Sequence, residues 1–280
     1  MPAKNILFLG FGDIATRTSA LLSEHRRVGV ARSVKNVPAT VEFWQGAADS
    51  VAILARLAEE QAFDAVVITL TPTDFSDKAY QVAYVDTVQA LVRQWHQSAA
   101  PGLIIFVSST SVYHQRDGQW VDEDSLTQPT GFSGKRLLEA EQCLLSSGLP
   151  ACVVRFAGIY GPGRDMLIRQ VEAGKGGNGD FSNRIHADDC AGVIAFLLQQ
   201  HWAGEALAPI YLGCDSTPAK GSEVRQWLAG KLGKDPRELQ SSDSHRGGNK
   251  RCSNRRLLSA GYELQYPGYR DGYSALLGDT

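Results

Sequence analysis

A glycine-rich turn near the start of the chain has the spacing that suits phosphate binding. The apolar run 6–9 is typical of a strand buried on both faces, and helical spacing of apolar residues follows it. Between them, Gly10 would permit a tight bend and Gly12 would let the backbone approach a diphosphate, while Ala15 would let the helix pack closely on the strand. Free N–H groups and the helix dipole would hold the phosphates, and a plain strand-turn-helix corner is the alternative. The predicted diphosphate contacts are Gly10, Gly12, Asp13, Ile14 and Ala15.

The end of the second apolar run carries basic residues at the point where such motifs discriminate between nicotinamide cofactors. Arg32, Ser33 and Lys35 follow the run 27–31, and no carboxylate stands at its end. An acidic residue about 20 positions after the glycines binds the ribose 2′-OH of NAD, whereas an arginine suits the 2′-phosphate of NADP. A guanidinium can donate a fork of hydrogen bonds to phosphate, although a solvated surface arginine is the alternative. The sequence therefore predicts NADP(H) in preference to NAD(H), with Arg32 and Ser33 as contacts.

Two later apolar runs end in hydroxyl-bearing residues. The run 64–70 is followed by Thr71, and the run 103–107 by Ser108 and Ser109. Strands that alternate with helices imply a parallel sheet with right-handed crossovers, and ligands bind beyond the carboxyl ends of its strands. The sequence thus predicts an α/β, Rossmann-type doubly wound parallel sheet. Further predicted cofactor contacts are Leu70, Thr71 and Ser108.

The spacing of apolar residues predicts the strands and helices that must position these candidate site residues. Strands are predicted at 6–9, 27–31, 41–44, 64–70, 103–107, 151–155 and 210–213. Helices are predicted at about 50–61, from after Thr73 to about 98, at 134–145, from within 183–189 to about 200, and at 222–232.

Composition limits the class of protein. The 280 residues are 43% hydrophobic, which is ordinary for a globular chain, and the net charge of −2 gives no reason to expect nucleic acid or an anionic membrane as partner. No apolar run approaches the roughly 18 residues that cross a bilayer, and no secretory signal fits the first residues. The five cysteines are scattered and form no metal-ligand cluster. We expect a cytoplasmic protein with reduced thiols, no metal and a small-molecule substrate, and a homodimer if the chain associates.

Five segments in order resemble the extended, atypical short-chain dehydrogenase/reductase superfamily of the NAD-dependent epimerase/dehydratase type. The opening glycine turn is the first, in a shorter Gly-x-Gly-x-x-Ala form. The other four are Phe106–Tyr113, Asp122–Pro129, the Arg-x-x-x-x-Tyr-Gly-Pro-Gly pattern of Arg155–Gly163, and the His-x-Asp-Asp pattern within Arg184–Ala191. The resemblance covers most of the chain and implies a nicotinamide cofactor.

The chain departs from this superfamily at its catalytic Tyr-x-x-x-Lys. If Lys135 is the lysine, Gly131 holds the tyrosine position; in the other register, Ser133 and Leu137 hold the two positions. Hydride transfer to a carbonyl leaves an oxyanion, which the superfamily's tyrosine protonates with help from the lysine ammonium. Without this pair, general acid catalysis worth about a hundred- to ten-thousand-fold is lost unless another group substitutes.

The resemblance assigns two further site residues, and the residue types themselves suggest the others. Ser109 matches the catalytic Ser/Thr position, and Lys135 would still reach the nicotinamide ribose. Tyr113, Tyr160 and His186 are candidate replacement acids, although packing or lobe-junction roles are the alternatives for them. Arg164 and Lys250 would hold an anionic substrate group, or else are solvated surface charges. The predicted catalytic residues are Ser109, Tyr113 and Lys135, and the predicted substrate-binding residues are Tyr160, Arg164, His186 and Lys250.

Two functions remain open from the sequence. The first is an NADP(H)-dependent oxidoreductase, epimerase or dehydratase acting on a small polar substrate, with a nucleotide sugar as one candidate. The second is a non-catalytic NADP(H)-binding redox sensor or regulatory protein, suggested by the missing tyrosine. We predict a cofactor domain of residues 1–162 plus about 185–215, and a smaller substrate lobe of about 163–184 plus 216–280 that closes over a cleft.

Overall fold

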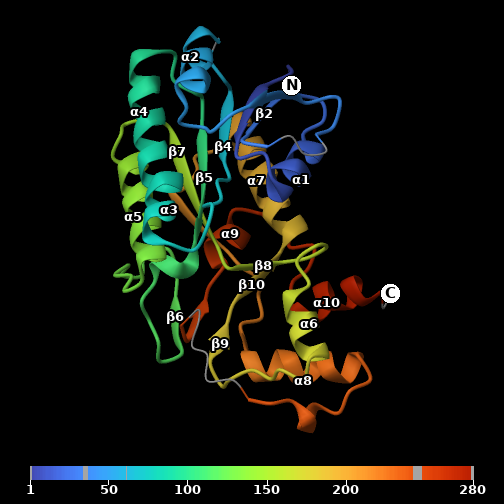
Figure 1. The fold of residues 1–280 in the computed structure, drawn as a ribbon. Helices are drawn as coiled ribbons and strands as arrows, with labels where there is room; N and C mark the ends of the chain where they lie inside the picture. The colour runs from blue at the N-terminus through green and yellow to red at the C-terminus, as the bar shows by residue number, and fades with distance from the viewer. Residues whose placement is uncertain (1, 34–36, 61, 242–247, 279–280) are drawn as a thin grey trace. The chain divides into compact units, whose positions relative to one another are not determined.

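The computed structural model describes residues 2–33, 37–60, 62–241 and 248–278 (Figure 1). Lys35 lies outside the described residues. The chain divides into two compact units: unit 1 contains residues 1–112, 128–155 and 191–211, and unit 2 contains residues 113–127, 156–190 and 212–280. The boundaries of these units differ from those of the predicted cofactor domain and smaller lobe, and that functional division stays a prediction.

A seven-stranded sheet forms the centre of unit 1. Its strands are β1 (Asn5–Leu9), β2 (Arg26–Ala31), β3 (Glu42–Gln45), β4 (Ala65–Ile68), β5 (Ile104–Ser109), β7 (Ala151–Phe156) and β11 (Ile210–Gly213). They are ordered β11-β7-β5-β4-β1-β2-β3, and β1 pairs in parallel with both β2 and β4. β2 pairs in parallel with β3, and β4 with β5. β2 and β3 lie on one side of β1, and the chain then crosses back to place β4, β5, β7 and β11 on the other side, so the sheet is doubly wound. The predicted Rossmann-type α/β fold is confirmed.

Helices cover both faces of this sheet. They are α1 (Asp13–Leu21), α2 (Val51–Glu59), α3 (Asp77–Tyr80), the π-helix η1 (Gln81–Asp86), α4 (Thr87–Gln97), the 3₁₀ turn η2 (Thr110–Val112), α5 (Phe132–Leu145) and α7 (Ala187–Trp202). Figure 1 shows α4 and α5 on one face and α1 and α7 on the other. The central strands are therefore buried on both sides, and the runs 6–9, 65–68 and 104–106 are 0% exposed.

Unit 2 is built from short strands and helices. They are β6 (Gln119–Val121), β8 (Gly158–Tyr160), α6 (Met166–Glu172), β9 (Phe181–Ser182), β10 (Arg184–His186), β12 (Ala219–Lys220), α8 (Gly221–Lys231), η3 (Pro236–Glu238), β13 (Lys250–Cys252), α9 (Arg255–Ser259) and α10 (Tyr269–Leu277). β8 pairs with β10 and β6 with β13, both in parallel, and β9 pairs with β12 antiparallel. One apolar core joins Tyr160 of β8 to residues of α6, α8 and α10.

The structure sets the bounds of three predicted helices. The helix expected to reach about residue 98 is not continuous. It consists of α3 and α4, and the π-helical turn η1 joins them. The helix expected to begin within 183–189 begins at Ala187, because residues 184–186 form β10 and pair with β8. The helix expected at 50–61 ends at Glu59, and Gln61 lies outside the described residues. Pairing between distant segments has no local sequence signal, so the short strands of unit 2 were not predicted.

Candidate functional site

The glycine turn is held against the end of the neighbouring strand. Gly10 has a φ of +90°, and a Cβ there would lie 2.6 Å from the carbonyl oxygen of Thr69, so only glycine fits. The Thr69 hydroxyl in turn donates to the Gly10 carbonyl at 2.7 Å. Gly12 precedes α1 with extended backbone and provides no side-chain cap. The first N–H groups of a helix have no intrahelical acceptor, so this corner offers donors to an anion, and the diphosphate contacts themselves stay a prediction.

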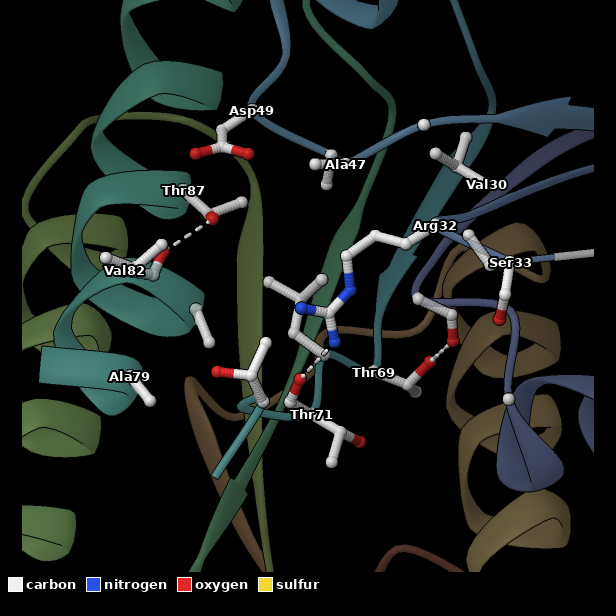
Figure 2. A pocket seen from close by; sticks show the side chains of 18 of the residues that line it. Val30, Arg32, Ser33, Ala47, Asp49, Thr69, Thr71, Ala79, Val82 and Thr87 are labelled. Atoms are coloured by element: carbon white, nitrogen blue, oxygen red, sulfur yellow. Dashed lines mark hydrogen bonds between the residues drawn. The ribbon is translucent and has the colours of Figure 1, made fainter. Parts of the chain in front are cut away.

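A cavity of about 370 Å³ opens beside this turn in unit 1 (Figure 2). One side is formed by the turn and by the segments that follow β2, β3 and β4 at their carboxyl ends. The opposite wall comes from α3, η1 and the start of α4. A volume of this size lies within the range of about 300–1,000 Å³ typical of ligand pockets. Of the predicted cofactor contacts, the cavity is lined by Gly10, Gly12, Arg32, Ser33, Leu70 and Thr71.

Arg32 reaches into this cavity from the end of β2. Figure 2 shows its guanidinium between Thr71 and Ala47, and its Nη2 donates to the Thr71 carbonyl at 3.2 Å. Gln45 Nε2 donates to the Arg32 carbonyl at 3.3 Å and thereby fixes the backbone there. No carboxylate of the described residues forms an ion pair with Arg32. A cation with only a carbonyl partner can exchange that partner for a phosphate.

The other predicted cofactor contacts lie apart from the cavity lining. The Asp13 carboxylate accepts from Arg17 Nε at 2.8 Å on the surface of α1. Ile14 and Ala15 are buried beneath the turn, at 7% and 0% exposure. Any contact from Ile14 or Ala15 to a diphosphate would therefore come from backbone N–H groups, as the motif implies.

Ser108 belongs to a buried polar cluster inside unit 1. Its hydroxyl donates to Glu141 Oε1 at 2.5 Å, and Arg155 Nη2 donates to Glu141 Oε2 at 2.7 Å. Arg155 Nε also lies 3.1 Å from both carboxylate oxygens, and the three residues are at most 5% exposed. The Ser108 side chain thus joins β5 to α5 and β7. Only the backbone of Ser108 could contribute to the predicted cofactor site.

The structure distinguishes the two registers for the missing Tyr-x-x-x-Lys. Gly131 caps the N-terminus of α5, is exposed, and has open space where a side chain would begin. Lys135 is exposed one turn later, and its N–H donates to the Gly131 carbonyl at 3.1 Å. In the other register Leu137 is only 4% exposed, so a lysine there would be buried in the core. The Gly131 and Lys135 register is therefore the one compatible with an accessible pair.

Ser109 follows Ser108 and faces away from the buried cluster, as alternate residues of a strand do. Its hydroxyl accepts from the Ser111 N–H at 3.2 Å, which shapes the turn into η2. A catalytic role for Ser109 and Lys135 stays a prediction.

The predicted substrate-binding residues of unit 2 do not form one group. Tyr160 and His186 lie together, with ring centroids 5.3 Å apart, and both are at most 4% exposed. His186 Nδ1 accepts from the Asp188 N–H at 3.2 Å, which agrees with the structural alternative for this histidine. Lys250 is 3% exposed in β13, and burial lowers its pKa. Arg164 is exposed at the surface of unit 2. Tyr113, the candidate acid, is 4% exposed.

Several residues of the cavity wall were missed by sequence reasoning. Asp49 lines the cavity after β3 and is labelled in Figure 2, as is Thr87 on the opposite wall. The rule that ligands bind beyond the carboxyl ends of strands could have found Asp49. Thr87 donates to the Val82 carbonyl at 2.9 Å across the π-helical turn, for which the sequence has no recognised signal.

Asp215 of unit 2 gives the protein a predicted pH dependence. Its side chain is 1% exposed, and burial raises its pKa to about 7 although Arg184 opposes the shift. In the unfolded chain the pKa of an aspartate is about 3.9. The free energy of unfolding is therefore highest below about pH 4, where both states are protonated. It falls as the pH rises to about 7, because only the unfolded chain loses its proton in this range. We expect Asp215→Asn to remove this decline. In urea titrations, its stability relative to wild type should rise from pH 5 to 7 and then stay level. An identical decline in both proteins would contradict this assignment.

Two features were sought among the described residues and not found: a membrane-spanning helix and a metal-binding cluster. None of their helices has the length and apolar character required to cross a membrane. Nor do they contain a cluster of three or more His, Cys, Asp or Glu side chains suited to a metal ion.

The fold and the glycine-turn cavity define a Rossmann-type α/β protein, and comparison with known proteins makes this more specific. No protein-family model matches the chain. It is 35% identical to Protein YeeZ of Escherichia coli K12 over 213 residues, which cover 73% of this chain and 72% of YeeZ. A solved Methylobacillus flagellatus structure assigned to the NAD-dependent epimerases/dehydratases is 32% identical, with a TM-score of 0.83 over 99% of this chain and 98% of that one. The chain belongs to the NAD-dependent epimerase/dehydratase family.

A more distant structure shares the fold. MoeE5, solved in complex with UDP-glucose and NAD, is 22% identical and has a TM-score of 0.81 over 98% of this chain and 97% of its own. The arrangement of elements is therefore common to nearly the whole length of both chains.

Proposed function

We propose that the chain is an NADP(H)-dependent oxidoreductase of the epimerase/dehydratase type that acts on a small polar substrate. The observation that carries the cofactor is the unit 1 cavity, in which the glycine turn and the α1 N-terminus stand beside the guanidinium of Arg32. The diphosphate would bind the turn, and Arg32 with Ser33 would receive the 2′-phosphate. A nucleotide sugar is the candidate substrate, supported by the UDP-glucose bound to MoeE5.

The cofactor preference is tested by titrating NADPH and NADH with and without Arg32. Charge-assisted hydrogen bonds contribute about 1.5–3 kcal/mol, so Arg32→Ala is expected to weaken NADPH binding about ten- to a hundredfold and to leave NADH binding unchanged. Arg26→Ala is the matched control, because Arg26 lies at the other end of β2 and pairs with Glu42 at 2.7 Å. Equal affinities for the two cofactors in the wild type would remove the 2′-phosphate argument.

The reaction is tested by incubating the protein with NADPH and a panel of carbonyl compounds and nucleotide sugars. Turnover supports the enzyme, and Ser109→Ala or Tyr113→Phe should then reduce it. If activity is found and neither variant reduces it, the proposed catalytic residues are wrong.

A second candidate function is an NADP(H)-binding sensor without catalysis. The observation that favours it is Gly131, which stands one helical turn before Lys135 where the superfamily has its tyrosine. Tight NADPH binding with no turnover on any member of the panel would favour this reading.

A further inference from the structure

Lys78 places a second positive charge in the lining of the unit 1 cavity. It belongs to α3, in the wall opposite the end of β2 that carries Arg32. Figure 2 shows Ala79, the next residue of α3, across the cavity from Arg32. Lys78 is exposed, and no carboxylate forms an ion pair with its ammonium among the described residues. A ligand in the cavity can therefore pair with this charge.

The acidic residue that precedes Lys78 in the chain is already paired with another cation. Asp77 Oδ1 accepts from Arg136 Nε at 2.8 Å, and Asp77 Oδ2 accepts from Arg136 Nη2 at 3.0 Å. Hydrogen bonds from this guanidinium lower the pKa of Asp77, so its carboxylate stays ionised and bound to α5. Ser76 Oγ accepts from the Ala79 N–H at 3.2 Å and caps α3. The start of α3 is thus fixed without using the charge of Lys78.

Arg32 is anchored to the segment that leads into α3. Its Nη2 donates to the carbonyl of Thr71, and the chain runs from Thr71 through residues 72–76 to the first turn of α3. Thr71, Thr73 and Ser76 of this segment line the same cavity as the two cations. The contact therefore places the guanidinium of Arg32 beside the segment that carries Lys78.

The charges in the cavity lining indicate why a second cation is needed. Its ionisable residues are Arg32, Lys78, Asp49 and Asp74. Two cations and two carboxylates leave the lining neutral, whereas without Lys78 the carboxylates would outnumber the cations. A phosphate monoester carries a charge of about −1.5 to −2 at pH 7, and nearby carboxylates repel it. Arg32 alone would therefore face this phosphate in a lining of net negative charge.

We propose that Lys78 is a specificity-determining residue for NADPH, and that its ammonium and the Arg32 guanidinium bind one 2′-phosphate from opposite walls of the cavity. The guanidinium provides hydrogen bonds of fixed direction, whereas the ammonium is a point charge on a flexible stem. This inference rests on the proposed function, because it requires NADP(H) as the cofactor. It adds a cation on α3 to the discrimination that the end of β2 provides.

Fluorescence titration of the full chain with NADPH and with NADH tests this role. Lys78→Met keeps an unbranched side chain and removes the charge, and the melting temperature should stay close to that of the wild type because the position is exposed. The dissociation constant for NADPH should rise about five- to tenfold, and that for NADH should not change. Lys78→Arg should keep the preference for NADPH. Lys78→Met combined with Arg32→Ala should bind the two cofactors equally.

Lys4→Met is the matched control, because it removes the same charge from unit 1 at a distance from the cavity. Lys4 precedes β1, and its Nζ pairs with Asp64 at 3.2 Å. This variant should leave both dissociation constants unchanged. The inference alone is overturned if the wild type prefers NADPH and Lys78→Met binds it equally well, or if Lys78→Met weakens NADPH and NADH by the same factor. A wild type without preference for NADPH overturns the cofactor assignment of the proposed function as well.

Discussion

Glu141→Ala is expected to destabilise the protein by about 3–5 kcal/mol, because it leaves the Arg155 guanidinium buried without a counter-charge. Arg155 is 3% exposed, and Glu141 receives its hydrogen bonds as well as that of Ser108. The loss therefore affects three elements, since β5, α5 and β7 meet at this carboxylate. Urea titration of the wild type and the variant measures the change in free energy of unfolding.

The same helix provides a control for this prediction. Glu139 is paired with Arg136 Nη1 at 2.9 Å, but both side chains are partly exposed to solvent. Surface pairs of this kind contribute about 0–1 kcal/mol, so Glu139→Ala should have a small effect. If the two alanine variants lose similar stability, the buried cluster does not hold the sheet to α5 as we describe.

Gly131→Tyr is expected to raise the rate of NADPH oxidation with any carbonyl substrate that binds. The new ring has open space at the α5 N-terminus, and it stands one turn before Lys135 on the same helix. A nearby ammonium lowers the pKa of a tyrosine, which makes the hydroxyl a better proton donor to the developing oxyanion. General acid catalysis of this kind contributes about a hundred- to ten-thousandfold, which stopped-flow or steady-state assays would detect easily.

Two companion variants isolate the proton transfer. Gly131→Phe places the same ring without its hydroxyl, and Gly131→Tyr combined with Lys135→Met keeps the hydroxyl without the ammonium. Both should fall well short of the single Gly131→Tyr variant. If Gly131→Phe performs as well as Gly131→Tyr, the gain comes from packing and the proposed acid role at this position is wrong.

The sequence alone determined the architecture around the cofactor cavity. The apolar runs, the turn at Gly10 and the alternation of strands with helices predict a parallel sheet. All strands of such a sheet present their carboxyl ends at one edge, so the sequence alone placed Arg32 and Thr71 near the glycine turn. Both line the same cavity in the structure.

Only the tertiary structure decided which way individual side chains point. Ser108 and Ser109 are equivalent in the sequence, but alternate residues of a strand face opposite sides. Glu141 and Arg155, from other elements, bind the first serine and leave the second outside the cluster. In the same way, burial of Leu137 selects the register of Lys135. These choices depend on partners distant in the chain, and local patterns carry no information about such partners.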